Sequence, residues 1–491
     1  MFREDKIVLG YIPIRRDFFP QPAAQAVRDQ IRPRIEQIVS KLYNVEMVNI
    51  DWLKNDKDPN DWGLAWDYSD VPKIVDYMKG KKIDAVFMPH CNFGQEEVVG
   101  QLGRDLGVPI LIWGPRDPRP GANGEFRPLD TQCGMFASTK ALYRYNVPYT
   151  YIENCWLDSP VLDKGIEDFV RTAAVVKAFR NMRVAQFGLR PRPFLSIKIN
   201  EADLMQQLGI EIVPIWLDEV STLVKRLKAG KVDPVSSKDP RHPLNPLENS
   251  GSPDPRIGQI MQDIKNCLDC STQTDDQLAT IAALKTAILE ISRAQGCSAV
   301  AVECWSDFRH EFDIGSCFLL ADINDAGLVA ACETDIHAAI TARMLQAAAR
   351  SQTASFIADL TIRHPDNDNA ELLWHCGPFA KSLKREGANG AVREFKGQYE
   401  IKHGPITIAR LEQDAGNNYM LFADEGKGVD GPPTNGTYVW FETNDWSKWE
   451  KHLMYNPYIH HVAGIHGNYA QILKEACKYI GRIKYDSVNQ Y

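Results

Sequence analysis

The sequence predicts an α/β protein with two tandem Rossmann-like domains, each built on a parallel sheet, followed by a β-rich, barrel-like C-terminal domain. Over roughly the first three quarters of the chain, short apolar runs alternate with stretches of helical periodicity, a pattern typical of parallel sheets covered by helices. After about Trp374 the pattern changes to short strands separated by Gly, Asn, Asp and Pro, which indicates an antiparallel β domain. With ~150 residues as the usual domain size, we expect the 491 residues to form domains at 1–180, 181–370 and 371–491.

The first domain is expected to begin with an apolar strand at residues 6–12. Apolar side chains then recur at helical spacing over residues 27–42, which predicts a helix. Further strands are expected at residues 46–50, 83–88 and 108–113. This alternation indicates a parallel sheet with helices on both faces.

The second domain repeats this alternation after a segment around Arg190. The predicted strands are residues 193–197, 210–215, 299–303, 327–332 and 354–360, and the predicted helices are residues 201–207, 217–227, 278–294 and 336–349. Six prolines among Ser, Asp and Asn between residues 231 and 256 predict a long loop.

The C-terminal portion has a different pattern of predicted secondary structure. Short strands are expected at residues 399–402, 406–411, 419–422 and 438–441, and a helix near residues 469–479. Because successive short strands with turn residues between them favour antiparallel pairing, we expect a small barrel-like domain here.

Composition excludes several classes of protein. A formal net charge of −8 argues against nucleic-acid and acidic membrane partners, which call for clustered Lys and Arg. No apolar run approaches the ~18 residues of a membrane span. The eleven scattered cysteines and the absence of a signal-like N-terminal segment favour reduced thiols and a cytoplasmic location. One C-x-x-C pair, Cys267 and Cys270, leaves a redox or zinc site open, but the nicotinamide, P-loop and zincin motifs do not occur.

An acidic segment follows the predicted strand 327–332. Glu333 and Asp335 stand where this strand gives way to a helix, and carboxyl ends of strands are where ligand-bearing residues gather in open α/β sheets. The alternative is structural: Thr334 or Asp335 could simply cap the helix, with Glu333 beside its dipole.

Asp359 and several histidines are further candidates. Asp359 lies in an apolar strand, where a buried carboxylate costs several kcal/mol unless it is paired or bound to a metal; the alternative is a turn-capping aspartate. His460 and His461 are adjacent, so only one of them is expected to reach a given site if the segment is extended. His375 lies beside Gly377 and Pro378, so it could also be a turn histidine.

Four segments taken in order resemble a known family. Residues 194–197, 332–335 and 356–359 and the late pair at 460–461 are similar, in order and approximate spacing, to L-fucose isomerase and its L-arabinose isomerase relatives. The resemblance extends from about residue 190 to the C-terminus. It is looser in the first domain, where residues 10–16 and 89–94 only partly match the family.

The resemblance implies a metal-dependent aldose–ketose isomerase. It implies that Mn²⁺, or another divalent cation such as Mg²⁺, is held by Glu333, Asp359 and His461, with His460 as the alternative to His461. It further implies a homo-oligomer, expected to be a hexamer, with the active site at a subunit interface. The family's sugar-stacking aromatic residue is replaced here by Cys91 or Asn92, so the resemblance does not specify L-fucose as the substrate.

The chemistry expected of these residues is proton transfer on an open-chain sugar through an enediol(ate). We expect Glu333 and Asp359 to be the catalytic carboxylates, without deciding which is the base at C2. The expected substrate-binding residues are Glu303, Trp305, His375, His460 and Arg16. A structural role for Glu303 remains open. Alternative functions are a metal-dependent epimerase, an aldolase-type lyase and a non-catalytic sugar-binding protein.

Overall fold

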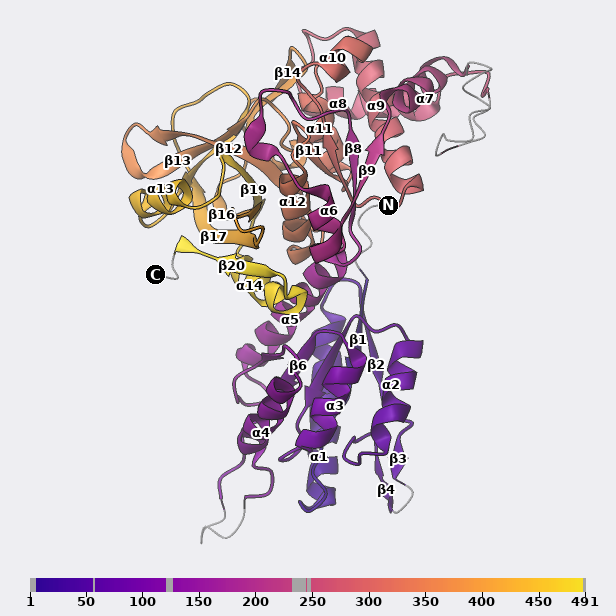
Figure 1. Ribbon diagram of the computed structural model, residues 1–491, viewed down its shortest axis with the longest axis vertical. Coiled ribbons are helices and arrows are strands. Elements are labelled where there is room, and N and C mark those ends of the chain that lie inside the picture. The colour runs from indigo at the N-terminus through magenta and orange to yellow at the C-terminus, as the bar shows by residue number, and fades with distance from the viewer. Residues whose placement is uncertain (1–5, 56–57, 121–126, 232–243, 245–248, 489–491) are drawn as a thin grey trace. The chain divides into compact units, whose positions relative to one another are not determined.

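The computed structural model describes residues 6–55, 58–120, 127–231, 244 and 249–488 (Figure 1). The described chain forms two compact units, which divide after Lys177. Each unit is described by itself below. No helix among the described residues is long and apolar enough to cross a membrane.

The N-terminal unit is built on a five-stranded parallel sheet. Its strands are β1 (Ile7–Tyr11), β2 (Val45–Asn49), β5 (Ala85–Pro89), β6 (Ile110–Trp113) and β7 (Thr150–Tyr151), in the order β2-β1-β5-β6-β7. Separate apolar cores lie on the two faces of the sheet, as expected for a sheet covered on both sides. The helices are α1 (Gln21–Ser40), α2 (Asp70–Gly80), α3 (Glu96–Leu106), α4 (Thr131–Arg144) and α5 (Pro160–Phe179), with a small hairpin of β3 (Lys54–Asn55) and β4 (Asp58–Trp62).

The strand order reverses between β1 and β5, and the loops after these strands lie together. Asn92, after β5, accepts a hydrogen bond from the backbone N–H of Arg16, after β1, at 2.7 Å. The Arg16 guanidinium also stacks over Phe93, 4.6 Å from the ring centroid. Arg16 therefore lies at the carboxyl edge of the sheet beside the topological switch point, where open α/β sheets place their ligands.

The second unit begins with a four-stranded parallel sheet. The strands β8 (Arg183–Phe187), β9 (Glu211–Ile215), β10 (Ala299–Val302) and β11 (Val329–Cys332) follow the order β9-β8-β10-β11, which is the order of the first four strands of the N-terminal sheet. The elements around them are η1 (Leu195–Ile197), α6 (Glu201–Asp203), η2 (Leu204–Leu208), α7 (Leu217–Ala229), α8 (Pro255–Cys267), α9 (Asp275–Ala294), α10 (Asp307–Phe312), α11 (Cys317–Asp325) and α12 (Ile336–Ala348).

Two sequence predictions for this region need correction or limitation. Residues 193–197 form a turn and the short 3-10 helix η1 rather than a strand, because Pro191 and Pro193 have no amide hydrogen for a ladder. The first strand is instead β8. Of the predicted loop 231–256, residues 232–243 and 245–248 lie outside the described residues, and α8 already begins at Pro255.

The C-terminal portion is an antiparallel barrel, as the sequence predicted. Six strands close into a ring because β18 pairs with β17 as well as with β13. These strands are β12 (Phe356–His364), β13 (Asn367–His375), β16 (Gly404–Gln413), β17 (Tyr419–Val429), β18 (Thr437–Glu442) and β19 (His461–His466). The flanking elements are η4 (Lys381–Leu383), β14 (Ala391–Arg393), β15 (Lys396–Glu400), α13 (Trp446–Tyr455), α14 (Ala470–Ile480) and β20 (Ile483–Asp486).

The barrel starts earlier than the sequence indicated. β12 begins at Phe356 and the predicted boundary at residue 370 falls inside β13, so the antiparallel sheet is continuous across Trp374. The residues that open β12, Phe356 to Ala358, are all buried. Such an uninterrupted apolar start looks the same in a parallel sheet, so the apolar run alone could not reveal the change of partner.

Helix α12 joins the parallel sheet to the barrel. All of its residues are buried, and it contacts β10 and β11 on one side and β16 and β19 on the other (Figure 1). One apolar core therefore runs through both parts of this unit. The residues at either end of α12 and on the neighbouring barrel strands are consequently held in fixed relation to one another.

Candidate metal centre and active site

Glu333, Asp359 and His461 meet at one point of the second unit, as the sequence analysis expected. Asp359 and His461 are direct cross-strand partners on β12 and β19. His461 Nε2 lies 3.1 Å from Asp359 Oδ1 and 3.2 Å from Glu333 Oε2. Residues separated by most of a domain in sequence therefore share one small volume, and the geometry favours His461 over His460.

Glu333 reaches this point through an unusual backbone turn. It follows β11 directly, and both Glu333 and Thr334 have left-handed backbone conformations, with φ of 60° and 58°. Two consecutive non-glycine residues in this region cost roughly 1–2 kcal/mol each. The Thr334 hydroxyl donates to the backbone carbonyl of Leu189 at 3.3 Å, which helps to hold the turn. Local strain of this kind is characteristic of functional sites.

The charges of the three residues depend on one another. Burial is the largest single influence and raises the pKa of Glu333 and of Asp359, but His461, His375 and other neighbouring groups together leave both pKa values below their usual range. Burial lowers the pKa of His461, yet its contacts with carboxylates raise that pKa well above the usual value. In the absence of any other cation, the imidazole is therefore the positive charge that balances the carboxylates.

The arrangement fits a divalent cation. His461 Nε2 and Asp359 Oδ1 are buried and make no hydrogen bond, although each lies close to the other, so both atoms point to a shared position. Among the described residues, Glu333, His375 and His461 form one group with ligand atoms within 4.8 Å of one another, and Asp359, His460 and His461 form a second. Carboxylate oxygens with an imidazole nitrogen suit Mn²⁺ or Mg²⁺.

Trp305 and Phe194 form an aromatic wall beside this centre. Trp305 Nε1 donates to Glu333 Oε1 at 2.9 Å, which leaves Oε2 facing His461. Phe194 stacks on Trp305 and on His460, with ring centroids 5.9 and 5.5 Å apart. Phe194 belongs to one of the four segments that resemble the family, and no role was predicted for it. Its own segment offered no signal for this role, because its ring partners come from distant parts of the sequence.

His460 and His375 flank the centre in different ways. His460 is half exposed, and its Nε2 lies 3.9 Å from Asp359 Oδ1. His375 is buried: its Nδ1 accepts a hydrogen bond from the Cys376 backbone N–H, and its Nε2 lies 2.9 Å from the Cys332 thiol. Burial lowers the pKa of His375, so its ring is neutral near pH 7. Of the two, only His460 is open to solvent, and sugar binding by either residue stays a prediction.

Glu303 has structural partners. Its carboxylate accepts hydrogen bonds from the backbone N–H groups of Trp305, Ser306 and Asp307 at 2.9, 3.0 and 2.7 Å. These groups precede and open α10, so the carboxylate satisfies donors at a helix N-terminus. Glu303 therefore holds the loop that carries Trp305, and the structural alternative left open by the sequence accounts for its position.

Comparison with known proteins relates both ends of the chain to one group of sugar isomerases. Residues 10–180 match the family described as fucose/sulfoquinovose isomerase, N-terminal domain. Residues 354–487 match the L-fucose isomerase C-terminal domain, and the two segments together cover more than half of the chain. The chain belongs to the L-fucose isomerase-like family.

Individual relatives agree with this assignment. The sulfoquinovose isomerases of Priestia aryabhattai and Priestia megaterium are each 24% identical over 479 residues, which cover 95% of this chain and 96% of the relative. The sulfoquinovose isomerase of Alkalicoccus urumqiensis is 22% identical over 364 residues, or 72% of this chain and 75% of the relative. The protein is therefore an isomerase of the aldose–ketose class.

Arg16 belongs to the N-terminal unit and is described with it. The C-x-x-C pair lies in the second unit of this isomerase. Cys267 ends α8 and Cys270 follows it, and neither joins any group of three candidate metal ligands in the described part of the chain. All eleven cysteines are free thiols.

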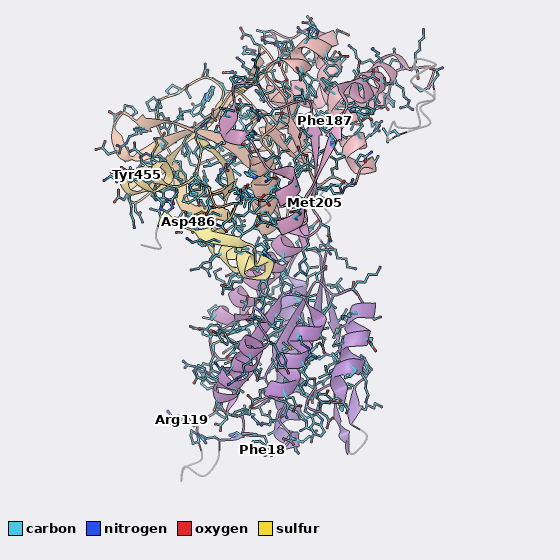
Figure 2. The ribbon with its side chains drawn as sticks, viewed as in Figure 1. Phe18, Arg119, Phe187, Met205, Tyr455 and Asp486 are labelled. Carbon is cyan, nitrogen blue, oxygen red and sulfur yellow. The ribbon has the colours of Figure 1, made fainter. Side chains whose placement is uncertain are left out.

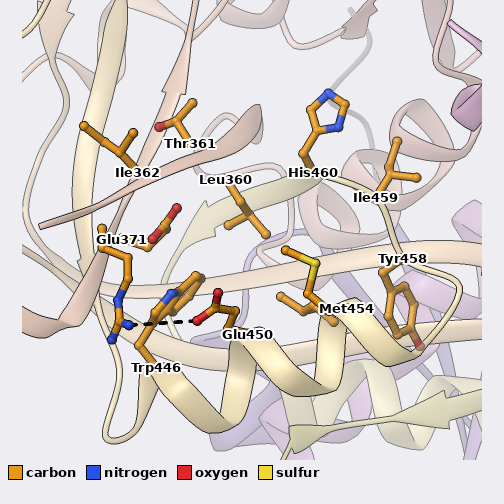
Figure 3. A pocket seen from close by; sticks show the side chains of 12 residues that line it. Leu360, Thr361, Ile362, Glu371, Trp446, Glu450, Met454, Tyr458, Ile459 and His460 are labelled. Carbon is orange, nitrogen blue, oxygen red and sulfur yellow. Dashed lines mark ion pairs between the residues drawn. The ribbon is translucent and has the colours of Figure 1, made fainter.

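A pocket of about 290 Å³ lies next to the centre in the barrel portion of the isomerase (Figure 3). His460, Met454, Trp446 and Glu371 are among the residues that line it. Burial and the nearby charge of Glu450 raise the pKa of Glu371 to about 7.

Replacing Glu303 by Gln should destabilise the isomerase by about 1–2 kcal/mol, because an amide cannot accept all of the backbone N–H bonds. Urea unfolding measures this change. The exposed Glu311 on the same helix provides the control, and Glu311→Gln should leave the free energy of unfolding unchanged. Unchanged stability of Glu303→Gln together with a raised KM would instead support direct sugar binding by Glu303.

Replacing Glu371 by Gln should stabilise the isomerase at pH 8 and have little effect at pH 4.5. In the wild type, the folded carboxyl keeps its proton up to about pH 7, while the unfolded one loses it near ~4.3. The folded state therefore binds more protons in this window, and wild-type stability falls as pH rises from about 4.5 to 7. Urea unfolding at several pH values measures the difference, expected to be of the order of 1 kcal/mol or more at pH 8.

The control for this pH dependence is Asp368→Asn, an exposed carboxylate on the same strand, β13. Its free energy of unfolding should depend on pH in the same way as that of the wild type. A Glu371→Gln curve parallel to that of the wild type at all pH values would contradict the raised pKa.

Proposed function

We propose that this isomerase interconverts an aldose and a ketose at a divalent-cation centre formed by Glu333, Asp359 and His461, through an enediol(ate) of the open-chain sugar. The convergence of His461 Nε2 with two carboxylate oxygens at 3.1 and 3.2 Å, in a chain of the L-fucose isomerase-like family, carries this proposal. A sugar-binding protein without catalysis would have no need for two carboxylates beside one imidazole.

The two carboxylates act as the proton-transfer pair in this proposal. One of Glu333 and Asp359 takes the proton from C2 and returns it to C1, and the other moves protons between O1 and O2. Both lie in one small site, as two successive transfers on neighbouring carbons require. The wall formed by Phe194 and Trp305 provides an apolar face against which the sugar carbons can pack.

A bound Mn²⁺ or Mg²⁺ would stabilise the negative charge that develops on the sugar oxygens. Glu333, Asp359 and His461 would hold the ion, and their two negative charges would balance its double positive charge. His461 is suited to this because its Nδ1 is occupied by Asp335 at 2.8 Å, which leaves Nε2 to face the centre.

The substrate that we propose to test first is sulfoquinovose, a sulfonated aldose, because the relatives named above are sulfoquinovose isomerases. A sulfonate needs a cationic partner. Arg192 and Lys198 are exposed on the segment that also carries Phe194, two and four residues from it along the chain, and are candidates for this partner.

Assembly and location remain predictions from the family resemblance. We propose a homo-oligomer, a hexamer in the first instance, with the active site at a subunit interface, in the cytoplasm. Large apolar side chains are exposed on the second unit, including Met205 and Tyr455 (Figure 2). Buried subunit contacts are one use for such side chains.

The decisive experiment assays sulfoquinovose, L-fucose and neutral hexoses with Mn²⁺, after removal of metal with a chelator, and after addition of Mn²⁺ again. We expect ketose formation that chelation abolishes and Mn²⁺ restores, with sulfoquinovose as the preferred sugar. NMR of the products separates an isomerase from an epimerase or a retro-aldol lyase. Full activity after verified removal of all metal would contradict the cation centre.

Replacing Glu333 by Gln keeps the shape of the side chain but removes a charge and a proton acceptor. Turnover should fall by at least ~10²-fold, the lower range for loss of a general acid–base group. Glu386→Gln, at an exposed position of the same unit, is the matched control and should retain wild-type kcat. Normal turnover of the Glu333→Gln variant would rule out this mechanism.

A further inference from the structure

A network of buried charged side chains contacts His461 on the side of its ring opposite the centre. Asp335 Oδ2 lies 2.8 Å from His461 Nδ1 and 2.6 Å from the Arg410 guanidinium. Arg410 also donates to Glu412 Oε1 at 2.8 Å, and Glu412 Oε2 lies 3.2 Å from His337 Nδ1. Asp335 and Arg410 have no solvent exposure at all.

The two oxygens of Asp335 have separate partners. Oδ1 accepts the backbone N–H of Ala338 at 2.9 Å and caps α12, which is the structural role that the sequence analysis considered. Oδ2 faces His461 and Arg410. Helix capping therefore accounts for one oxygen of Asp335 and leaves the other unexplained.

Stability alone is a poor explanation for this network of charges. Moving each ion out of water costs several kcal/mol, and well-packed apolar residues of similar volume often serve stability equally well. The surrounding α12, β16 and β19 are otherwise rich in buried apolar side chains. Fully buried charges directly behind a ligand-bearing histidine are better explained by what they do to that histidine.

The contacts fix both the tautomer and the orientation of the imidazole. A carboxylate paired with a guanidinium can only accept, so the Nδ1 of His461 must donate to Asp335. The lone pair of the neutral ring is then on Nε2, which faces Glu333 and Asp359. Arg410, on β16, in turn holds Asp335 in place, and β16 is paired with β19, the strand that His461 begins.

We propose that Asp335, held by Arg410, is a positioning residue that sets the divalent-cation affinity of His461. This inference rests on the proposed cation centre. Outer partners of metal-binding histidines raise ligand basicity and restrict ring rotation, and their loss weakens metal binding by about 10–100-fold in other sites. Asp335 itself touches neither the ion nor the sugar.

The test measures Mn²⁺ dissociation constants of the purified full chain by EPR detection of free Mn²⁺, together with unfolding temperatures. Asp335→Asn keeps a good N-cap for α12 but loses the charge that faces His461 and Arg410. We expect its Kd for Mn²⁺ to rise by about 10–100-fold. Arg410→Lys keeps the positive charge but cannot hold Asp335 and Glu412 together, and its Kd should lie between those of the wild type and Asp335→Asn.

Asp322→Asn is the matched control. Asp322 is an equally buried carboxylate in the same unit, paired with Lys285 at 2.8 Å and with Lys381, and it lies in α11 rather than at the centre. Its loss should lower the unfolding temperature as the loss of Asp335 does, but the Kd for Mn²⁺ should stay at the wild-type value. Destabilisation and loss of metal affinity are thereby separated.

The outcomes distinguish this inference from the proposed function. Wild-type Mn²⁺ affinity in both Asp335→Asn and Arg410→Lys would overturn the positioning role and leave the cation centre intact. An equal loss of affinity in Asp322→Asn would also overturn it, because the effect would then follow stability alone. A wild-type chain that isomerises sugars but binds no Mn²⁺ would overturn the cation centre and the positioning role together.

Discussion

The hydrogen bond between His461 and Asp335 is the contact on which the candidate site depends, because it joins two differently built parts of one unit. Asp335 stands at the N-terminus of α12, directly after the parallel sheet, and His461 begins β19 of the barrel. The 2.8 Å contact between their side chains links the end of the sheet to a strand of the barrel. Glu333, two residues before Asp335, and Asp359, across the strand from His461, are brought together by the same contact.

The charges in this region are arranged so that no carboxylate is buried alone. Asp335 and Glu412 share Arg410, while Glu333 and Asp359 share His461. Because an unpaired buried charge costs several kcal/mol, each group is held where it is by its partner. The left-handed turn at Glu333 and Thr334 adds a further cost, which the packing of α12 and the Thr334 contact offset. The turn that positions the Glu333 carboxylate therefore lowers the local stability of the fold.

Much of the fold could be predicted from the sequence because periodicity reports which face of an element is buried. The parallel sheets, the helices between them and the C-terminal barrel all follow from that pattern. The start of the barrel did not, since a strand such as β12 that is buried from its first residue reads alike in either sheet type. The segment 193–197 was misjudged because its apolar residues suggested a strand while its prolines prevented one.

The site was predictable to a different extent. Glu333, Asp359 and His461 could be selected as a group only through resemblance, because nothing local shows which distant residues meet. The contact of Asp335 with His461 and the stacking of Phe194 on Trp305 join distant parts of the sequence, so neither could be predicted from the local segment. Arg410 and Glu412 did offer a signal: opposite charges two residues apart in an apolar strand share a face and form a buried pair. Nothing in the sequence indicated the structural partners of Glu303, because they are backbone N–H groups of the following turn.

The barrel also determines how strictly the ligand distances are set. Asp359 and His461 are opposite one another in an antiparallel ladder, and the Leu360 N–H bonds the His460 carbonyl at 2.8 Å, so their spacing is fixed by backbone hydrogen bonds rather than by flexible loops. A shift of register by one residue would turn Asp359 to the other face of the sheet and bring Leu360 opposite His461. Closure of the barrel through β17 and β18 resists such a shift, because every strand of the ring would have to slip together. Glu333, in contrast, is placed by the left-handed turn between β11 and α12, so the barrel ladder fixes Asp359 and His461 and the strand-to-helix turn fixes Glu333.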